Sequence, residues 1–399
     1  MKILHTADWH LGKRLDRFSR MEEQIQVMDE IVAIADEQQV DLVLIAGDLF
    51  DNFNPSVEAV ELFYKTLKRL SNYGKRPIIA IAGNHDSPSL IDAPDPLARA
   101  SGIILIGHPQ AKIQTFELED FKVTKSETGF FELELKNYDY PIRIIHTPYA
   151  NEIRLKQYFS EDKEKALNEI LSHHWKTLAD QFCDANGVNI LVTHLYMNKR
   201  GAPLLDEPEG EKPIKIGNAD LVFSDAIPPQ MQYTALGHLH GARNIGTKEN
   251  PVVYSSSPLA YSFSEAGQIK SVSIIDLQPN EAVSIEKIEL RSGRQLVRKS
   301  FDDVNECVEW LTENPNTLVE LTIESDSYIK AEDRKRIYQS HDGIIYLIPK
   351  VKNIDNQNNT LKEIDITQDL EPLFVDYFKS KNDNQEPNQD LMDIFKEIL

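Results

Sequence analysis

The sequence predicts an α/β protein, and three observations carry that prediction. Short apolar runs such as Leu42–Ile45 and Ile78–Ile81 have the length and β-branched content of buried strands. Between such runs, apolar residues recur at helical spacing, and strands alternating with helices predict a sheet whose faces are covered by helices. Polar residues of the kind that ligate metals directly follow several of these strands, at the edge where α/β sheets bind ligands.

The expected elements of residues 1–280 follow one another in this alternating order. A first strand at Ile3-Leu4 precedes a helical pattern over Met21–Ala35, which leads to the strand Leu42–Ile45. A second helical pattern, Val60–Leu67, leads to the strand Ile78–Ile81. Further strands are expected at Ile103–Ile106, Ile142–Ile145, Asn189–Val192, Tyr233–Leu236, Val252–Tyr254 and Ser271–Leu277.

The pattern changes near residue 280, and three further segments are expected. Residues 281–350 predict a small α+β domain, residues 351–366 form a polar linker, and residues 367–399 form a helix-loop-helix. The small domain would contain strands at Ala282–Leu290, Leu318–Ile323 and Ile344–Ile348 and a helix at Val304–Leu311. The two tail helices would span Thr367–Lys379 and Gln389–Leu399, each with an apolar stripe that needs a docking surface.

The net charge of the chain is −21, with 64 acidic and 43 basic residues. Taken alone, this charge argues against binding to nucleic acid, because proteins that bind polyanions are usually basic. That argument is weak for a metal-dependent enzyme, which concentrates carboxylates and needs only a local basic rim. Lys13, Arg14, Arg17 and Arg20 could form such a rim, or could simply be a solvated helix start.

The sequence contains no run of about 18 apolar residues, so no membrane-spanning helix is expected. The first residues are expected to form a strand and not a signal peptide. Cys183 and Cys307 lie far apart in the sequence and form no metal-binding pattern. Two such cysteines fit a protein of the reduced cytosol best.

Metal-ligand residue types follow five predicted strands. They are Asp8-Trp9-His10, Gly47-Asp48, Gly83-Asn84-His85-Asp86, Thr193-His194 and Gly237-His238-Leu239-His240. Each string alone has an ordinary explanation: a turn, a helix cap or a structural histidine. Five together predict a metal site.

The spacing of these residues supports that interpretation. Side chains at i and i+2 of an extended segment point the same way, so Asp8 with His10, and His238 with His240, can aim at one pocket. Magnesium and calcium prefer all-oxygen shells, whereas imidazoles favour manganese, iron or zinc. Because no thiolate is present, manganese is the expected metal. The neighbouring glycines, which let the backbone turn sharply, are Gly12, Gly47, Gly83 and Gly237.

The series Asp-x-His, Gly-Asp-x-x-Asp, Gly-Asn-His-Asp, Thr-His and Gly-His-x-His resembles the calcineurin-like metallophosphoesterase superfamily over residues 1–275. The strings HTADWHLG, AGDLFD, GNHDSP and GHLH are similar to the SbcD nuclease family, as are the length and the tail. The resemblance implies a metallophosphoesterase β-sandwich flanked by helices over 1–280, a capping and DNA-binding domain over 281–350, and a C-terminal helix-loop-helix over 367–399.

The resemblance also implies a role for each site residue. Asp48 would bridge two manganese ions, and His85 would face the scissile phosphate as the catalytic residue. The first site would be completed by Asp8, His10 and His240, and the second by Asn84, His194 and His238. Related archaeal and eukaryotic nucleases carry a histidine where this chain has Asp51, so no role of that histidine carries over.

The implied activity is cleavage of DNA: 3′-to-5′ exonuclease action on duplex ends and endonuclease action on hairpins. The implied partner is an SbcC-type coiled-coil ATPase, since the sequence has no phosphate-binding Gly-x-x-x-x-Gly-Lys-Ser/Thr loop of its own. A homodimer within a heterotetramer would form through Ser56–Leu70 and Leu90–Leu97, and the complex would act in the cytoplasm at the nucleoid.

Two alternatives stay open at the level of sequence. The first is a phosphodiesterase or phosphatase of the same fold that acts on small molecules such as cyclic nucleotides. The extension of roughly 120 residues after the core argues against it. The second is an inactive scaffold of this fold, which would be expected to have lost ligands, whereas every expected ligand type is present here.

Overall fold

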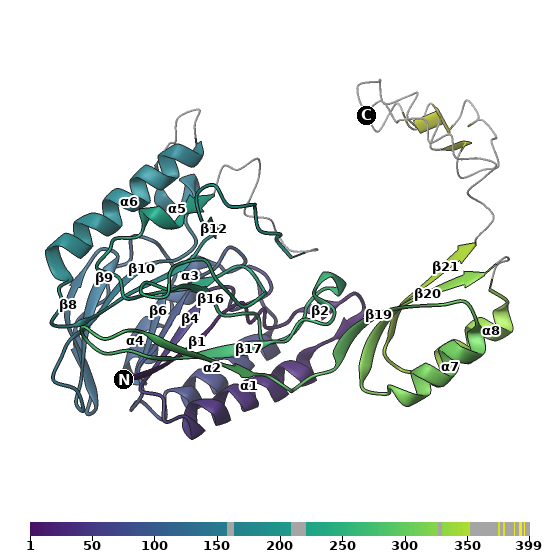
Figure 1. The fold of residues 1–399 in the computed structure, drawn as a ribbon, viewed down its shortest axis with the longest axis horizontal. Coiled ribbons are helices and arrows are strands. Elements are labelled where there is room, and N and C mark those ends of the chain that lie inside the picture. Colours follow the sequence, from purple (N-terminus) through teal and green to yellow (C-terminus); the bar gives the residue numbers. More distant parts are fainter. Residues whose placement is uncertain are drawn as a thin grey trace.

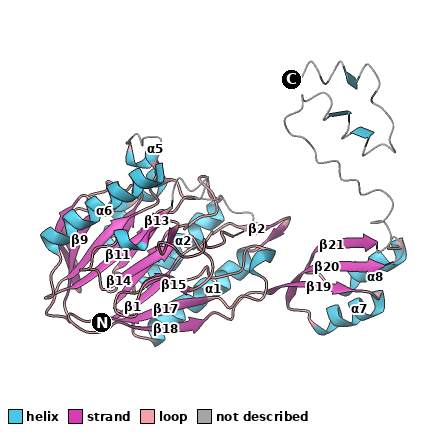
Figure 2. Cartoon of the chain, turned by 45° about the horizontal axis from the view of Figure 1, so that its top comes forward, coloured by secondary structure: helices cyan, strands magenta, loops and turns pink. Residues whose placement is uncertain are grey.

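Two β-sheets and the helices on their outer faces form the body of the protein (Figures 1 and 2). The computed structural model describes residues 1–157, 163–208, 221–325 and 329–351, together with positions 374, 375, 378, 379, 387, 391, 392 and 395.

The first sheet is built from buried apolar strands. Its order is β18 (Ser284–Glu289), β17 (Ser271–Asp276), β1 (Lys2–Thr6), β4 (Leu42–Ala46), β5 (Ile78–Ile81) and β6 (Ile103–Ile106). Strands β1, β4, β5 and β6 are parallel, so their carboxyl ends meet at one edge. Helices α1 (Met21–Glu37) and α2 (Val57–Leu70) cover the outer face through apolar residues such as Ile31 and Phe63.

The second sheet is also parallel at its centre. Its order is β15 (Arg243–Asn244), β16 (Val252–Tyr254), β14 (Tyr233–Gly237), β11 (Val188–His194), β10 (Ile142–Thr147), β9 (Phe130–Leu135), β8 (Phe121–Glu127) and β7 (Phe116–Glu117). Strands β10, β11, β14 and β16 are parallel. Helix α6 (Lys163–Phe182) covers the outer face through residues such as Leu171 and Trp175.

The inner faces of the two sheets share one apolar core, to which the first sheet contributes residues such as Leu44 and Ile79 and the second residues such as Ile144 and Ile190. Both faces of the central strands are therefore covered, which explains why they read as continuous apolar runs without polar alternation. The predicted sandwich flanked by helices is confirmed.

Short elements complete the body. They are the hairpin β2 (Arg14–Leu15) and β3 (Phe18–Ser19), helices α3 (Pro88–Asp92), α4 (Asp95–Ala100) and α5 (Glu152–Leu155), the pair β12 (Met197–Asn198) and β13 (Val222–Phe223), and the 3₁₀ turns η1 (Ser224–Ala226) and η2 (Phe263–Glu265).

A small domain stands apart from the body (Figure 1). Its parallel sheet comprises β19 (Gln295–Phe301), β20 (Thr317–Ser325) and β21 (Ile344–Val351), and its helices are α7 (Val304–Glu313) and α8 (Ala331–Ser340). An apolar cluster joins it to the body, with Leu15 and Phe263 on one side and Leu296, Leu318 and Ile345 on the other.

One predicted boundary is wrong. The strand expected at Ala282–Leu290 belongs to the first sheet as β18, where it pairs with β17, and the small domain begins at β19 instead. The reason is that β18 lies at a sheet edge and carries only exposed and half-exposed residues, so its pattern differs from that of the central strands.

The tail falls mostly outside the described residues, including linker positions 352–366 and apolar-stripe residues Leu370, Leu373, Tyr377 and Ile398. Among its described positions, Phe374 stacks on Phe395 with ring centroids 4.0 Å apart. Among the helices of the described chain, none is both long and apolar enough to cross a membrane.

Candidate metal centre

The carboxyl ends of five strands converge where the two sheets meet. Strands β1, β4 and β5 arrive from the first sheet, and β11 and β14 arrive from the second. The approach is close: a Cβ atom on Gly237 would lie 1.9 Å from the carbonyl oxygen of Ala46. A Cβ atom on Gly83 would lie 2.1 Å from Asp48 Oδ1. Glycine is therefore required at both positions by the contact between strand ends.

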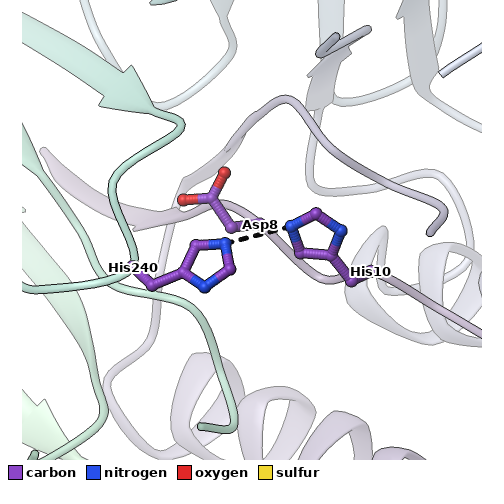
Figure 3. A group of neighbouring side chains, drawn as sticks. All are labelled: Asp8, His10 and His240. Carbon is purple, nitrogen blue, oxygen red and sulfur yellow. Dashed lines mark hydrogen bonds between the residues drawn. The ribbon is translucent and has the colours of Figure 1, made fainter. Parts of the chain in front are cut away.

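A first cluster contains Asp8, His10 and His240, each offering one ligand atom within 4.8 Å of the others (Figure 3). His10 Nε2 and His240 Nε2 lie 3.1 Å apart. The lone pair of a neutral imidazole nitrogen can accept a proton or bind a cation, so both nitrogens could bind one cation between them. Asp8 Oδ1 accepts a hydrogen bond from the backbone N–H of His238 at 2.8 Å. Asp8 Oδ2 is buried and meets no donor within the described part of the chain.

A second cluster contains Asp48, His194 and His238, again within 4.8 Å of one another. Asn84 joins it, because its Oδ1 lies 2.9 Å from His194 Nε2. Asp48 Oδ2 lies 3.4 Å from His194 Nε2 and 3.6 Å from His10 Nε2. One carboxylate oxygen therefore lies between the two clusters.

His85 lies beside both clusters. Its backbone N–H donates to Asp48 Oδ1 at 2.9 Å, and its Nδ1 lies 2.7 Å from the carbonyl oxygen of Asp51. Its ring is 4.9 Å from that of His10, and the ligand atoms of His10, Asp51 and His85 form a third group within 4.8 Å. Lys13 Nζ pairs with Asp51 Oδ1 at 3.0 Å. Asp51 is thus tied into an ion pair.

The centre needs positive charge. Burial raises the pKa of Asp8 to about 6, because its carboxylate has lost water. Burial alone would lower the pKa of His194, but the adjacent Asp48 carboxylate outweighs it and raises that pKa to about 9. A proton on His194 then balances the buried carboxylates, and a bound cation would supply the same charge.

Four of the expected ligands have backbone conformations that non-glycine residues rarely adopt. The φ angles of Asp8, His10, Asp48 and His238 are +55°, +44°, +48° and +107°. Such strain costs on the order of 1–3 kcal/mol per residue and persists mainly at functional sites.

Several residues that orient the ligands were missed by sequence reasoning. Glu265 Oε1 lies 3.2 Å from His240 Nδ1, and Glu207 Oε1 lies 2.7 Å from His238 Nε2. The Ala46 carbonyl oxygen lies 2.8 Å from His194 Nδ1. Outer partners of this kind fix the orientation of ligating histidines. Glu207 lies in a loop without a motif, and Glu265 ends η2, where it forms a capping box with Ser262. A capping box predicts only a helix start, so no sequence signal indicated a role beside the metal ligands for either residue.

The suggested basic rim is partly wrong. Arg20 is 1% exposed, donates to both carboxylate oxygens of Glu23 and to the Ala260 carbonyl, and therefore serves packing. Arg14 and Arg17 lie on the hairpin β2–β3 and remain accessible.

Family comparison supports the geometry. Residues 1–224 match the model of the calcineurin-like phosphoesterases. The chain belongs to this family. It is 33% identical, over 409 aligned residues, to the SbcD component of the SbcCD nuclease of Bacillus subtilis, with all of this chain and 97% of the relative covered. It therefore also belongs with the SbcD proteins of that family, as the sequence motifs indicate.

Two solved structures are among those similar to this chain. A dimetal phosphatase from Danio rerio is 11% identical, with a TM-score of 0.41, 73% of this chain and 99% of that one covered. A putative 5′-nucleotidase from Staphylococcus aureus is 15% identical, with a TM-score of 0.38, 85% of this chain and 57% of that one covered.

The residues present fit the dinuclear metal centre that the phosphoesterase fold implies. The two clusters offer carboxylate, amide and imidazole donors without thiolate, and the buried Asp8 Oδ2 and the facing imidazoles of His10 and His240 match a bound cation.

Proposed function

We propose that this protein is the metal-dependent nuclease subunit of an SbcCD-type DNA-repair complex and cleaves phosphodiester bonds in DNA. The observation that carries the proposal is the pair of buried ligand clusters that share Asp48 Oδ2. The full-length similarity to the SbcD component of the SbcCD nuclease supports DNA as the substrate. The expected activities are 3′-to-5′ cleavage at duplex ends and endonucleolytic cleavage of hairpins.

Each cluster would hold one cation. Asp8, His10 and His240 would hold the first, Asn84, His194 and His238 the second, and Asp48 would contact both. Two divalent cations supply Lewis-acid charge against the non-bridging phosphate oxygens and make water more acidic. We propose manganese as the metal, with iron, zinc and magnesium as less favoured occupants, because imidazoles are mixed with oxygen donors.

The protein's own groups hold the reacting parts in place. Glu265 keeps the ring of His240 oriented, and the Ala46 carbonyl does the same for His194. Hydrolysis forms a bond between water oxygen and phosphorus and breaks the bond to the departing sugar oxygen. His85 can stabilise the developing charge or deliver a proton to that oxygen. Its Nδ1 is held by the carbonyl of Asp51, which fixes the direction of its ring.

The remaining parts of the chain would bind DNA, the partner ATPase and a second copy of the chain. We propose that the small domain contributes to DNA binding and that residues 367–399 dock on the coiled-coil ATPase through their apolar stripes. We also propose a homodimer through α2 and the α3–α4 segment. Much of the apolar face of α2 packs on the first sheet, but Val57 and Leu97 are each 79% exposed and available for a second copy.

The two alternatives predict different results. A small-molecule phosphodiesterase would cleave activated diesters and leave DNA intact, and an inactive scaffold would cleave neither. The described ligand set retains the carboxylate, amide and imidazole donors of both clusters, which disfavours the scaffold.

A plasmid-nicking assay and a linear-duplex assay with added manganese test the proposal. Asp48→Asn should lose at least about 10²-fold in activity, since even outer-shell changes cost 10–100-fold. Glu134→Gln, which removes an exposed carboxylate paired with Lys122 on the outer strands of the second sheet, is the control and should cut at the wild-type rate. Absence of DNA cleavage by the wild type, or full activity in Asp48→Asn, would overturn the proposal.

A further inference from the structure

The side chain of Arg154 is buried next to the candidate metal centre, although none of the roles described above uses it. Arg154 lies on α5, after strand β10, and is 9% exposed. Its two terminal nitrogens donate to two backbone carbonyls, Nη1 to that of Gly83 at 2.8 Å and Nη2 to that of Asp86 at 2.9 Å. These carbonyls lie on either side of Asn84 and His85, so one planar guanidinium spans the turn that carries both.

The same turn is held from the inside by a carboxylate. Asp86 accepts hydrogen bonds from the backbone N–H groups of Gly83 at 2.7 Å, Phe50 at 2.9 Å and Leu49 at 3.0 Å. The turn after β5 is thereby tied to the loop that follows Asp48. Arg154 binds the carbonyl groups of the same turn, and its positive charge lies near the carboxylate of Asp86. The position of His85 thus depends on two ionic side chains, one inside the turn and one outside.

The guanidinium itself is held in a fixed orientation. Its central carbon lies 4.8 Å from the ring centroid of Tyr149 and 5.9 Å from that of Phe53. The Asn151 side chain caps α5 by accepting from the backbone N–H of Arg154 at 2.9 Å. Burying a cation is costly, and the nearby carboxylates of Asp86 and Asp48 offset only part of that cost. A turn that needed only packing could be filled by an apolar side chain.

We propose that Arg154 is a positioning residue of the nuclease site, whose fork sets the Gly83–Asp86 turn so that His85 faces the departing sugar oxygen. The proposal rests on the proposed function and adds a residue to its machinery. It also explains the residue type. Arginine presents two parallel donors in one plane, whereas lysine is a point charge that cannot hold two carbonyls at a fixed spacing.

A positioning role has a consequence that a general packing role lacks. If Arg154 acts through His85, its loss should matter only where the leaving oxygen needs a proton or charge stabilisation. The alkoxide released from DNA needs this help, whereas the nitrophenolate released from bis(p-nitrophenyl) phosphate does not. Proton transfer by a positioned side chain contributes about 10²–10⁴-fold, so a displaced His85 should lose a measurable part of that range.

The experiment compares Arg154→Lys, His85→Ala and the double variant in the full chain with manganese. Arg154→Lys should lower kcat on duplex DNA by roughly 10–100-fold and kcat on the activated diester by less than about threefold. The double variant should be no slower on DNA than His85→Ala alone, because residues acting in series are not additive. Arg143→Lys is the matched control: Arg143 is buried too, pairs with Glu132 and Asp184 away from the site, and should leave both rates unchanged.

Other outcomes overturn the inference. Wild-type kcat on DNA in Arg154→Lys would show that the fork is not needed. Equal losses on both substrates, or additive losses in the double variant, would show a role in metal binding or folding only. If Arg154→Lys fails to fold, Arg154→Gln, which keeps an amide donor without the charge, takes its place in the same comparison. Absence of DNA cleavage by the wild type would instead refute the proposed function.

Discussion

Glu265 offers a sharp test of how the candidate metal centre is supported. Its carboxylate is buried, lies 3.2 Å from His240 Nδ1 and accepts from Lys270 Nζ at 2.6 Å. Burial alone would raise the pKa of Glu265, but His240 and Lys270 outweigh it and hold that pKa well below its usual range. Replacing Glu265 by Gln preserves the shape of the side chain and removes its charge, which both His240 and Lys270 require.

Two effects of Glu265→Gln can be estimated separately. Loss of the outer partner of a ligating histidine should weaken manganese binding by about 10–100-fold, or about 1.4–2.7 kcal/mol. Loss of the counter-charge leaves Lys270 as a buried unpaired cation, since it is 7% exposed, and should destabilise the fold by about 3–5 kcal/mol.

A double variant separates the two effects. Glu265→Gln with Lys270→Met removes both charges, so most of the lost stability should return while manganese affinity stays low. Calorimetric titration with manganese measures the affinity, and denaturant unfolding measures the stability. Wild-type manganese affinity in Glu265→Gln would refute the idea that Glu265 supports the metal centre. Recovery of affinity in the double variant would show that the single variant merely misfolds.

Four further predictions concern other parts of the molecule. Gly83→Ala should reduce manganese affinity by about tenfold or more in calorimetry, because the new Cβ would lie 2.1 Å from Asp48 Oδ1; unchanged affinity would mean that the turn can move. Burial lowers the pKa of His146 to about 3, so the unfolded chain takes up a proton that the folded chain refuses. His146 should therefore contribute a loss of stability of about 1.4 kcal/mol per pH unit as pH falls below about 6.5. His146→Phe should reduce the slope measured by denaturant unfolding by that amount and leave the similar contribution of His5. Light scattering should show a dimer at tens of micromolar, and Leu97→Asp should make it monomeric; a monomeric wild type would refute the proposed interface. Deleting residues 360–399 should spare manganese-dependent cleavage of simple DNA ends and abolish copurification with the ATPase, and full copurification would exclude the tail as the docking element.

Much of the architecture could be predicted because apolar strands and ligand motifs are both local signals. Leu42–Ala46 is apolar at every position, and the polar residues that follow it could only lie at the end of the strand. The structure brings Asp8, His10 and His240 into one group and Asp48, His194 and His238 into another, as the resemblance implied. Their binding of metal remains a prediction.

Other features depend on contacts between distant segments and left no local pattern. Edge strand β18 carries mixed exposure, and its partner β17 could not be inferred from its own residues. Arg154 and Asp86 hold the same turn from positions 68 residues apart in sequence, and only the fold places them together. Arg20 reads as a surface cation until its contacts with Glu23 and Ala260 are seen.

We propose that the ends of strands from two sheets assemble one centre for two metals, with Asp48 shared between them. Electron paramagnetic resonance of the manganese-loaded protein, combined with metal analysis, tests this claim most directly. We expect two manganese ions per chain with the spectrum of an exchange-coupled pair, and loss of that coupling in Asp48→Asn. A single manganese ion per chain, or two ions without magnetic coupling in the wild type, would contradict it.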